Sequence, residues 1–257
     1  MYAEERQRQI VSLAHEQDRV TVAELADRFS VTTETIRRDL EVLDERGLVQ
    51  RVHGGALPRA TGRFAPELGL VERETRNVPQ KMAIARSALT HLPGKAGSVI
   101  LDAGTTTGQL AALLPEDAPL PTLITNSVAI AALLSARDMA DVLIVGGQVR
   151  GITQSVVGAN ATEAVGRLRV DVAFLGANGM SAQHGFSTPD LDEAMVKRAM
   201  IRAARKVVAL VDSSKIGTEA LHRFARLSDV DVLITDAGIP DAVRAEFTDQ
   251  AVEVVVA

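Results

Sequence analysis

Residues 32–57 read TTETIRRDLEVLDERGLVQRVHGGAL, and this stretch decides the fold of the N-terminal part of the chain. Apolar side chains at helical spacing predict one buried helix face. These side chains are Ile36, Leu40 and Leu43. The helix should end near Arg46, because Gly47 stands where a left-handed C-cap belongs. Residues 48–52, a His-Gly-Gly turn and a short return over residues 56–57 then predict a two-stranded hairpin.

Two helices precede this one. Ile10, Leu13 and Ala14 give a single apolar stripe and predict the first helix over residues 4–17. The second opens at Thr21, where Glu24 three residues later completes a capping-box pattern. Three helices with a short turn before the third, followed by a glycine-bearing hairpin, form a winged helix-turn-helix, which places its third helix in the major groove of double-stranded DNA. We assign this domain to residues 1–57.

The first turns of the third helix, together with the wing, supply the candidate DNA-binding residues. Threonine suits phosphate or thymine contacts, and arginine suits guanine or phosphate. The candidates on the helix are Thr32, Thr33, Thr35, Arg37 and Arg38, and the candidates on the wing are Arg51 and His53.

A solvated helix face is the alternative interpretation of the two helix arginines. Glu34 with Arg38, and Arg37 with Glu41, are pairs of opposite charge at i, i+4, each worth roughly 0.3–0.5 kcal/mol. Residues 1–60 hold nine basic and eleven acidic side chains, and the whole chain has a net charge of −5. A nucleic-acid binder usually has a basic footprint. DNA binding must therefore depend on where a few arginines lie.

Composition narrows the class of protein further. The chain has 257 residues, 46% of them hydrophobic and 24% charged, which is typical of a soluble globular protein. No apolar run approaches the roughly 18 residues that cross a bilayer, and the N-terminus is no signal peptide, so we expect no membrane. Cysteine is absent, which fits the cytoplasm and removes thiolate metal sites and cysteine nucleophiles. Aromatic residues make up 3%, too few for stacking on single strands. We expect no metal and no cofactor.

A second domain follows a polar, proline-bearing linker, which we place at residues 58–77. In residues 78–257, short β-branched apolar runs alternate with helical stretches. This alternation predicts a mainly parallel sheet covered on both faces, hence an α/β domain. The strands are expected over residues 98–102, 120–125, 142–145, 170–176, 206–212, 232–236 and 252–256. Ligands of such sheets bind at the carboxyl ends of the strands.

Small and hydrogen-bonding residues gather at those strand ends. Residues 102–107, Asp-Ala-Gly-Thr-Thr-Thr, follow a strand and open a helix, an arrangement that can cradle an anion. The candidate effector-binding residues are Asp102, Gly104, Thr105, Thr106, Thr107, Asn126, Gly147, Asn178 and Lys215. Two alternatives stay open, because threonines are ordinary N-caps and a lysine after a strand is commonly just solvated.

Both halves resemble the DeoR family of bacterial repressors, in the family's order. The first half carries Thr35-Ile36-Arg37-Arg38-Asp39-Leu40 and Arg51-Val52-His53-Gly54-Gly55-Ala56. The second half carries Asp102-Ala103-Gly104-Thr105-Thr106, Gly176-Ala177-Asn178-Gly179 and Asp212-Ser213-Ser214-Lys215. The resemblance implies a recognition helix with Arg37 and Arg38, and a phosphorylated sugar bound by the 104–107 loop with help from Lys215.

A regulator of this kind is expected to repress a sugar-catabolism operon as a homo-oligomer, and to leave operator DNA when the sugar phosphate binds. The opening Met1-Tyr2-Ala3-Glu4-Glu5-Arg6-Gln7 is similar to fructose- and glycerol-type regulators of the family. Fructose 1-phosphate is therefore the first candidate effector.

An isomerase is the competing interpretation, because the family's sensor fold resembles ribose-5-phosphate isomerase. Aldose–ketose isomerisation needs a base near the substrate carbon and an acid at the carbonyl. The isomerases carry Asp-Gly-Ala-Asp where this chain has Leu175-Gly176-Ala177-Asn178, so both carboxylates are gone. Acid–base groups could come from Asp190, Asp192, Glu193 and Lys197. We favour helix-start acids and an i, i+4 pair of Glu193 with Lys197, and expect no catalysis.

Overall fold

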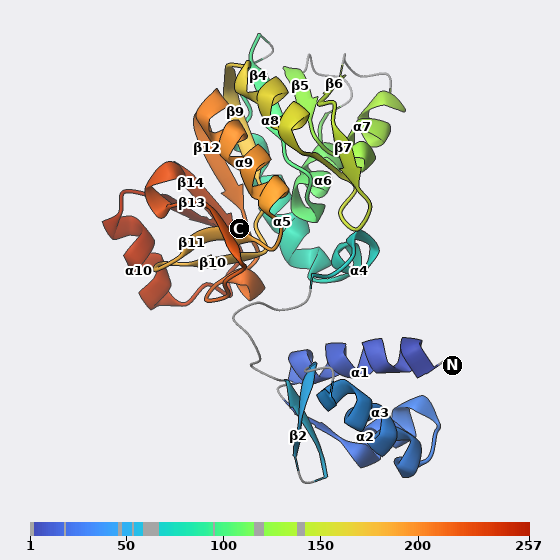
Figure 1. Ribbon diagram of the computed structural model, residues 1–257. Coiled ribbons are helices and arrows are strands. Elements are labelled where there is room, and N and C mark those ends of the chain that lie inside the picture. Colours follow the sequence, from blue (N-terminus) through green and yellow to red (C-terminus); the bar gives the residue numbers. More distant parts are fainter. Residues whose placement is uncertain are drawn as a thin grey trace. The chain divides into compact units, whose positions relative to one another are not determined.

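A computed structural model describes residues 3–17, 19–45, 48–52, 54–58, 67–94, 96–115, 121–137 and 142–257. The chain forms two compact units, residues 1–65 and 66–257 (Figure 1), and each is described by itself. The expected C-cap at Gly47 and the wing residue His53 lie outside the described residues.

The first unit has the predicted three helices and hairpin, with one strand more than expected. The helices are α1 (Ala3–Gln17), α2 (Val22–Phe29) and α3 (Thr33–Glu45), and the strands are β1 (Val20–Thr21), β2 (Val49–Val52) and β3 (Gly55–Pro58). The strands pair antiparallel in the order β1-β3-β2. Ile10, Leu25 and Ile36 meet in one buried core beneath the sheet.

The extra strand β1 explains one glycine of the wing, and backbone geometry explains the other. Val20 lies opposite Ala56, and Thr21 lies opposite Gly55. A Cβ atom at Gly55 would lie 2.0 Å from the carbonyl oxygen of Val20, so only glycine lets β1 approach. Gly54 adopts a positive φ of 79°, which glycine tolerates without strain. A strand of two residues is too short to show a periodic pattern in the sequence.

Side chains close the starts of α2 and α3. The capping box at Thr21 is confirmed: Thr21 Oγ1 accepts from Glu24 N at 3.3 Å, and Glu24 Oε2 accepts from Thr21 N at 3.2 Å. Thr32 has the same role for α3, because its Oγ1 accepts from Thr35 N at 3.2 Å. These bonds satisfy amide groups that a helix start otherwise leaves unpaired.

A buried ion pair fixes α1 against α3. Arg6 Nε lies 2.6 Å from Asp39 Oδ2, and Gln7 Nε2 donates to Asp39 Oδ1 at 2.9 Å. Arg6 and Asp39 are only 7% and 4% exposed. Because Asp39 points inward, its neighbours Arg37 and Arg38 are left on the exposed face of α3.

Replacing Asp39 by Ala should lower the free energy of unfolding of the first unit by about 3–5 kcal/mol, because Arg6 would remain buried without its partner. Urea unfolding of the full chain, followed by limited proteolysis within residues 1–58, measures this loss. Asp27→Ala removes an exposed carboxylate from α2 and serves as the control. An equal loss in both variants would rule out the structural role of the Arg6–Asp39 pair.

The second unit is built on a seven-stranded sheet in which every pairing is parallel. Its order is β15-β14-β12-β9-β4-β5-β6. The strands are β4 (Ser98–Leu101), β5 (Thr122–Thr125), β6 (Val142–Ile144), β9 (Val170–Leu175), β12 (Ala204–Leu210), β14 (Val232–Thr235) and β15 (Glu253–Val256). All seven were predicted, and so was the α/β class.

Helices cover both faces of this sheet (Figure 1). They are α5 (Val78–Ala88), α6 (Thr105–Ala112), α7 (Val128–Ser135), α8 (Ala159–Gly166), α9 (Leu191–Ala203) and α10 (Asp241–Asp249), with short 3-10 turns at Leu89–His91, Ser213–Lys215 and Leu227–Asp229. Two buried cores result. Ile100 packs into the core that includes Val165 of α8, whereas its neighbours Val99 and Leu101 pack into the core that includes Ile84 of α5. This alternation is what a strand covered on both faces requires.

Five short strands were not predicted. They are β7 (Gln148–Arg150), β8 (Ser155–Val157), β10 (Gly179–Ser181), β11 (Gly185–Thr188) and β13 (His222–Ala225). The first two form an antiparallel hairpin, and the other three form a small antiparallel sheet in the order β10-β11-β13. Each strand has only three or four residues, and several of these residues are glycine or serine. Neither the length nor the content of β-branched residues therefore marks these segments as strands.

The later part of the expected linker belongs structurally to the second unit. Residues 67–77 contain helix α4 (Leu70–Thr75), and Leu70 N donates to the carbonyl oxygen of Ile152 at 2.9 Å. Glu67 forms a two-pronged ion pair with Arg150 of β7. A salt bridge between residues 83 positions apart leaves no periodic signal in the sequence. None of the described helices is long and apolar enough to cross a membrane.

Candidate DNA-reading surface and effector crevice

Helix α3 presents two arginines to solvent. Arg37 Nη1 lies 3.5 Å from Glu34 Oε2, and both side chains are more than half exposed, so this pair contributes little. Within the described residues, Arg38 has no ion pair and no side-chain hydrogen bond. Neither of the i, i+4 pairs considered from the sequence forms among those residues. The two guanidinium groups are therefore available to an external anion.

The remaining candidates on this unit fall into two groups. The Thr32 hydroxyl caps the helix and lies 2.9 Å from the Thr35 hydroxyl, and both Thr32 and Thr33 are exposed. On the wing, Arg51 Nη1 lies 3.4 Å from Glu41 Oε1, and Arg51 N donates to Asp44. Glu41 therefore pairs with the wing and not with Arg37. These contacts hold the wing beside the helix.

A topological switch point lies between β4 and β9. From β4 the chain continues to β5 and β6 on one side, and it later returns to β9 and continues to β12, β14 and β15 on the other side. Loops from adjacent strands diverge at such a point, and ligands of open α/β sheets bind there, outside the carboxyl ends of the strands. The loops after β4 and β9 carry residues 102–107 and 176–178.

We call this switch point, with residues 102–107 and 176–178, the effector crevice. A buried ion pair lies there. Asp102 is 1% exposed and pairs with Lys197 of α9, which also donates to the carbonyl oxygen of Gly176 at 3.1 Å. The amide of Gly176 donates to Asp102 Oδ2 at 3.0 Å. Burial raises the pKa of Asp102 above its ordinary value, although Lys197 opposes that shift. Asp102 thus ties β4, β9 and α9 together.

Three further candidates also hold the crevice in shape. Thr107 Oγ1 donates to the carbonyl oxygens of Asp102 and Gly104 at 2.6 and 2.8 Å. Asn126 Oδ1 accepts from Ala103 N at 2.8 Å, and its Nδ2 donates to Val156 O at 3.2 Å. At Gly147 a Cβ atom would lie 2.7 Å from the carbonyl oxygen of Val157.

The start of α6 has no side-chain cap. Gly104 is the N-cap, and the first helical hydrogen bond runs from Gly108 N to Gly104 O at 2.9 Å. The amides of residues 105–107 therefore precede the helical ladder. By contrast, Ser127 caps α7 with its hydroxyl, and Asp190 caps α9 with its carboxylate. An uncapped helix start with free amides is suited to an anion.

A group of cations lies at the same carboxyl edge of the sheet, around Asp212. It consists of Arg73, Arg76, Lys81 and Lys215. Burial lowers the pKa of Lys81 to about 8, with Lys215 and Arg73 adding repulsion, and burial likewise lowers the pKa of Lys215. Within this described group, Arg73 Nε and Nη2 are buried without a hydrogen-bond partner. Sequence reasoning found Lys215 but did not place Arg73, Arg76 and Lys81 beside it, because they come from residues 73–81, more than 130 positions away in the chain.

Helix α9 carries a second buried acid. Glu193 accepts from Thr153, Ser155 and Thr188 at 2.7–2.9 Å and lies 3.4 Å from Arg150 Nη1. Although burial acts to raise it, Lys197 and the three hydroxyls hold the pKa of Glu193 below its ordinary value. Glu193 and Lys197 are both buried and act on each other through their charges, but their direct ion pairs are with Arg150 and Asp102, not with each other as expected. Asp190 is a helix-start acid, as expected.

Each of the two units matches a known domain family. Residues 6–59 match the DeoR-like helix-turn-helix domain, and residues 76–237 match the DeoR C terminal sensor domain. The chain belongs to the DeoR family. The match to the sensor domain alone spans more than half of the chain.

Relatives in the DeoR family match nearly end to end. The HTH-type transcriptional regulator GlpR of Haloferax volcanii is 38% identical over 99% of this chain and 98% of its own length. The HTH-type transcriptional repressor GlcR of Bacillus subtilis is 33% identical over 97% and 94%. The glycerol-3-phosphate regulon repressor of Escherichia coli is 30% identical over 95% of each chain. This DeoR-family chain is a DNA-binding transcriptional regulator and not an enzyme.

Among solved structures, the full-length sorbitol operon regulator SorC of Klebsiella pneumoniae matches 94% of this chain and 98% of its own, with 14% identity and a TM-score of 0.42. Ribose 5-phosphate isomerase A of Neisseria gonorrhoeae matches 54% of this chain and 53% of its own, with 16% identity and a TM-score of 0.39.

Proposed function

We propose that this regulator represses a sugar-catabolism operon, and that a phosphorylated sugar bound in the crevice releases it from operator DNA. The observation that carries the proposal is the uncapped start of α6, which lies at the same sheet edge as Lys215 and its cationic neighbours. Helix amides and a cation together recognise phosphate. The name of one relative, the glycerol-3-phosphate regulon repressor, is in line with a phosphorylated effector.

In this proposal some crevice residues bind the ligand and others hold the crevice in shape. The amides of Thr105, Thr106 and Thr107 and the ammonium group of Lys215 hold the phosphate, and the side chain of Asn178 bonds sugar hydroxyls. The residues that shape the crevice are Asp102, Gly104, Asn126 and Gly147. Fructose 1-phosphate is the first candidate ligand.

On the DNA side, Arg37 and Arg38 read base edges or phosphates in the major groove, Thr32, Thr33 and Thr35 contact the backbone at the helix start, and Arg51 and His53 contact the flanking backbone. One such helix covers one half-site, so the regulator acts as a homo-oligomer in the cytoplasm. The edge strand β6 supports self-association, because Leu143 and Ile144 are 50% and 46% exposed there.

Helix α9 is the element that we propose transmits the signal. Lys197 on α9 bonds the crevice residue Asp102, and Glu193 one turn earlier bonds Arg150. Arg150 in turn binds Glu67, where the second unit begins. A ligand that shifts Asp102 would therefore also shift Arg150 and Glu67. Glu67 lies at the start of the second unit, where the chain from the DNA-binding unit enters it. Such control requires different ligand affinities in the two states.

Thr105→Pro should weaken fructose 1-phosphate binding by about tenfold, because proline removes one amide donor while remaining compatible with the first position of a helix. Lys215→Gln should weaken the binding by a similar factor through loss of the charge. Calorimetric titration of the full chain with fructose 1-phosphate, glycerol 3-phosphate and free fructose measures both effects.

The control is Lys206→Gln, which removes a lysine from β12 whose Nζ lies 3.1 Å from His91 Nδ1. Binding of free fructose as tight as that of its phosphate, or full affinity in both crevice variants, would contradict the assignment of the crevice.

A further inference from the structure

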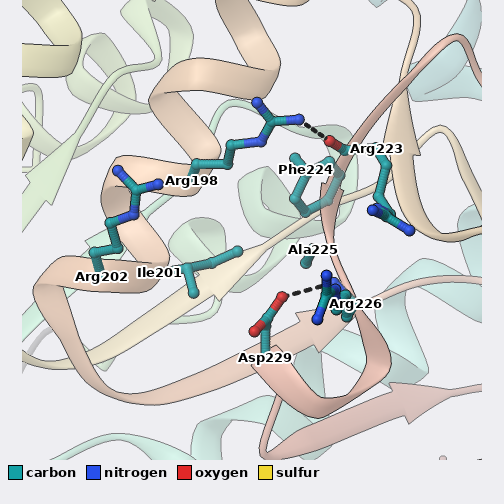
Figure 2. A pocket seen from close by; sticks show the side chains of 8 residues that line it. All are labelled: Arg198, Ile201, Arg202, Arg223, Phe224, Ala225, Arg226 and Asp229. Atoms are coloured by element: carbon teal, nitrogen blue, oxygen red, sulfur yellow. Dashed lines mark hydrogen bonds between the residues drawn. The ribbon is translucent and has the colours of Figure 1, made fainter.

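A second cationic site lies at the C-terminal half of α9 (Figure 2). It is a pocket of about 400 Å³, within the size range of small-molecule sites. Arg198 and Arg202 come from α9, whereas Arg223 comes from β13 and Arg226 from the turn that follows it. Ile201, Phe224, Ala225 and Asp229 complete the lining.

The charge of this pocket is not balanced by the protein. Four arginines and one carboxylate line the pocket, which gives a formal charge of +3 in a chain whose net charge is −5. Within the described residues, none of the four arginines forms an ion pair. Arg198 donates to the neutral backbone carbonyl of Arg223, and Asp229 accepts from the backbone amide of Arg226 at 2.7 Å. Gathered like charges repel unless an anion joins them.

One side of the pocket is buried and its rim is open: Arg198 is half-buried, whereas Arg202, Arg223 and Arg226 are exposed. Phe224 and Ala225 are 5% and 2% exposed and form an apolar wall, and the bond from Arg198 to the strand fixes one guanidinium group. Lys197 Nζ lies 5.3 Å from the centroid of the Phe224 ring, but it is bonded to Asp102 of the crevice. The pocket and the crevice therefore use different cations. Arginine forks match phosphate oxygens in pairs, which suits them to this anion more than to a halide.

We propose that this pocket binds a small metabolite carrying two phosphate groups, as a second anion site apart from the effector crevice. Each phosphate carries about 1.5–2 negative charges at neutral pH, so two phosphates match the excess of positive charge. A single phosphate would leave part of that excess unpaired. The competing view, four independently solvated arginines, predicts no saturable binding.

Pyrophosphate is the probe, titrated calorimetrically into the full chain at fixed ionic strength. Saturable binding is expected, with orthophosphate binding more weakly. The double variant Arg198→Gln with Arg223→Gln should lose about 100-fold in affinity. Arg167→Gln with Arg205→Gln removes two exposed arginines outside the pocket, with side chains 76% and 82% exposed, and should leave the affinity unchanged.

Three results would overturn the proposal: no saturable binding to the wild type, an equal loss in the pocket and control variants, or a loss in Lys215→Gln that the pocket variant does not show. Thermal melting of each variant verifies that the fold is intact.

Discussion

Replacing Arg37 and Arg38 together by Ala should reduce the affinity for operator DNA on the order of 100-fold at fixed salt. Each arginine that pairs with a base or phosphate contributes roughly 1–3 kcal/mol. Both side chains are exposed on α3, and Arg38 has no competing ion pair within the described residues. Because residues 1–60 are net acidic, no general basic surface can replace these two contacts. The loss should therefore be nearly complete under ordinary conditions.

The measurement is fluorescence anisotropy with a duplex that the wild-type protein selects from a random-sequence library. Arg86→Ala, which removes an exposed arginine from α5 in the second unit, controls for lost charge. The salt dependence of affinity should become shallower in the Arg37/Arg38 variant, because fewer counterions are released. An affinity within twofold of the wild type would exclude α3 as the recognition helix.

Replacing Lys197 by Met should lower the free energy of unfolding of the second unit by about 3–5 kcal/mol at pH 7.5. Methionine keeps the length of the side chain, but Asp102 would remain buried without its cation. The double variant Asp102→Asn with Lys197→Met removes both charges of the pair and should regain much of the loss, although the buried Glu193 still lacks the nearby lysine. Urea unfolding of all three proteins gives the comparison.

The loss in Lys197→Met should shrink at low pH. Burial raises the native-state pKa of Asp102, and removing Lys197 raises it further, because that lysine opposes the shift. An acid whose native-state pKa is raised destabilises the fold increasingly as pH rises from its ordinary value through the raised one. The deficit should thus be full at pH 7.5 and smaller at pH 5. A deficit that is the same at both pH values would contradict a buried, uncompensated Asp102.

The parts that sequence reasoning predicted are those with local patterns. The strands of the parallel sheet are apolar β-branched runs, and α2 begins with a capping box that lies within four residues. The winged helix-turn-helix follows from helical spacing and two glycines. These signals need no knowledge of which segments meet in space.

The parts that were missed depend on partners far apart in the sequence. Asp102 stays a candidate effector residue, but its pairing with Lys197, 95 residues away, was not predicted. Lys197 was expected to pair with Glu193 on the same helix, but its direct ion pair is with the buried Asp102. The cations around Asp212 come together only because α4 and α5 return to the carboxyl edge of β12. Spacing along the chain carries no trace of such contacts.

Ligand-dependent release from DNA tests the central claim most directly. The selected duplex is bound to saturation, and its anisotropy is followed while fructose 1-phosphate, glycerol 3-phosphate, glucose 6-phosphate or free fructose is added. We predict that at least one phosphorylated compound, fructose 1-phosphate first, releases the wild type, and that free fructose does not. Lys215→Gln should bind the same DNA but resist release. Bound DNA that no phosphorylated compound displaces, or a Lys215 variant released as readily as the wild type, would contradict the account.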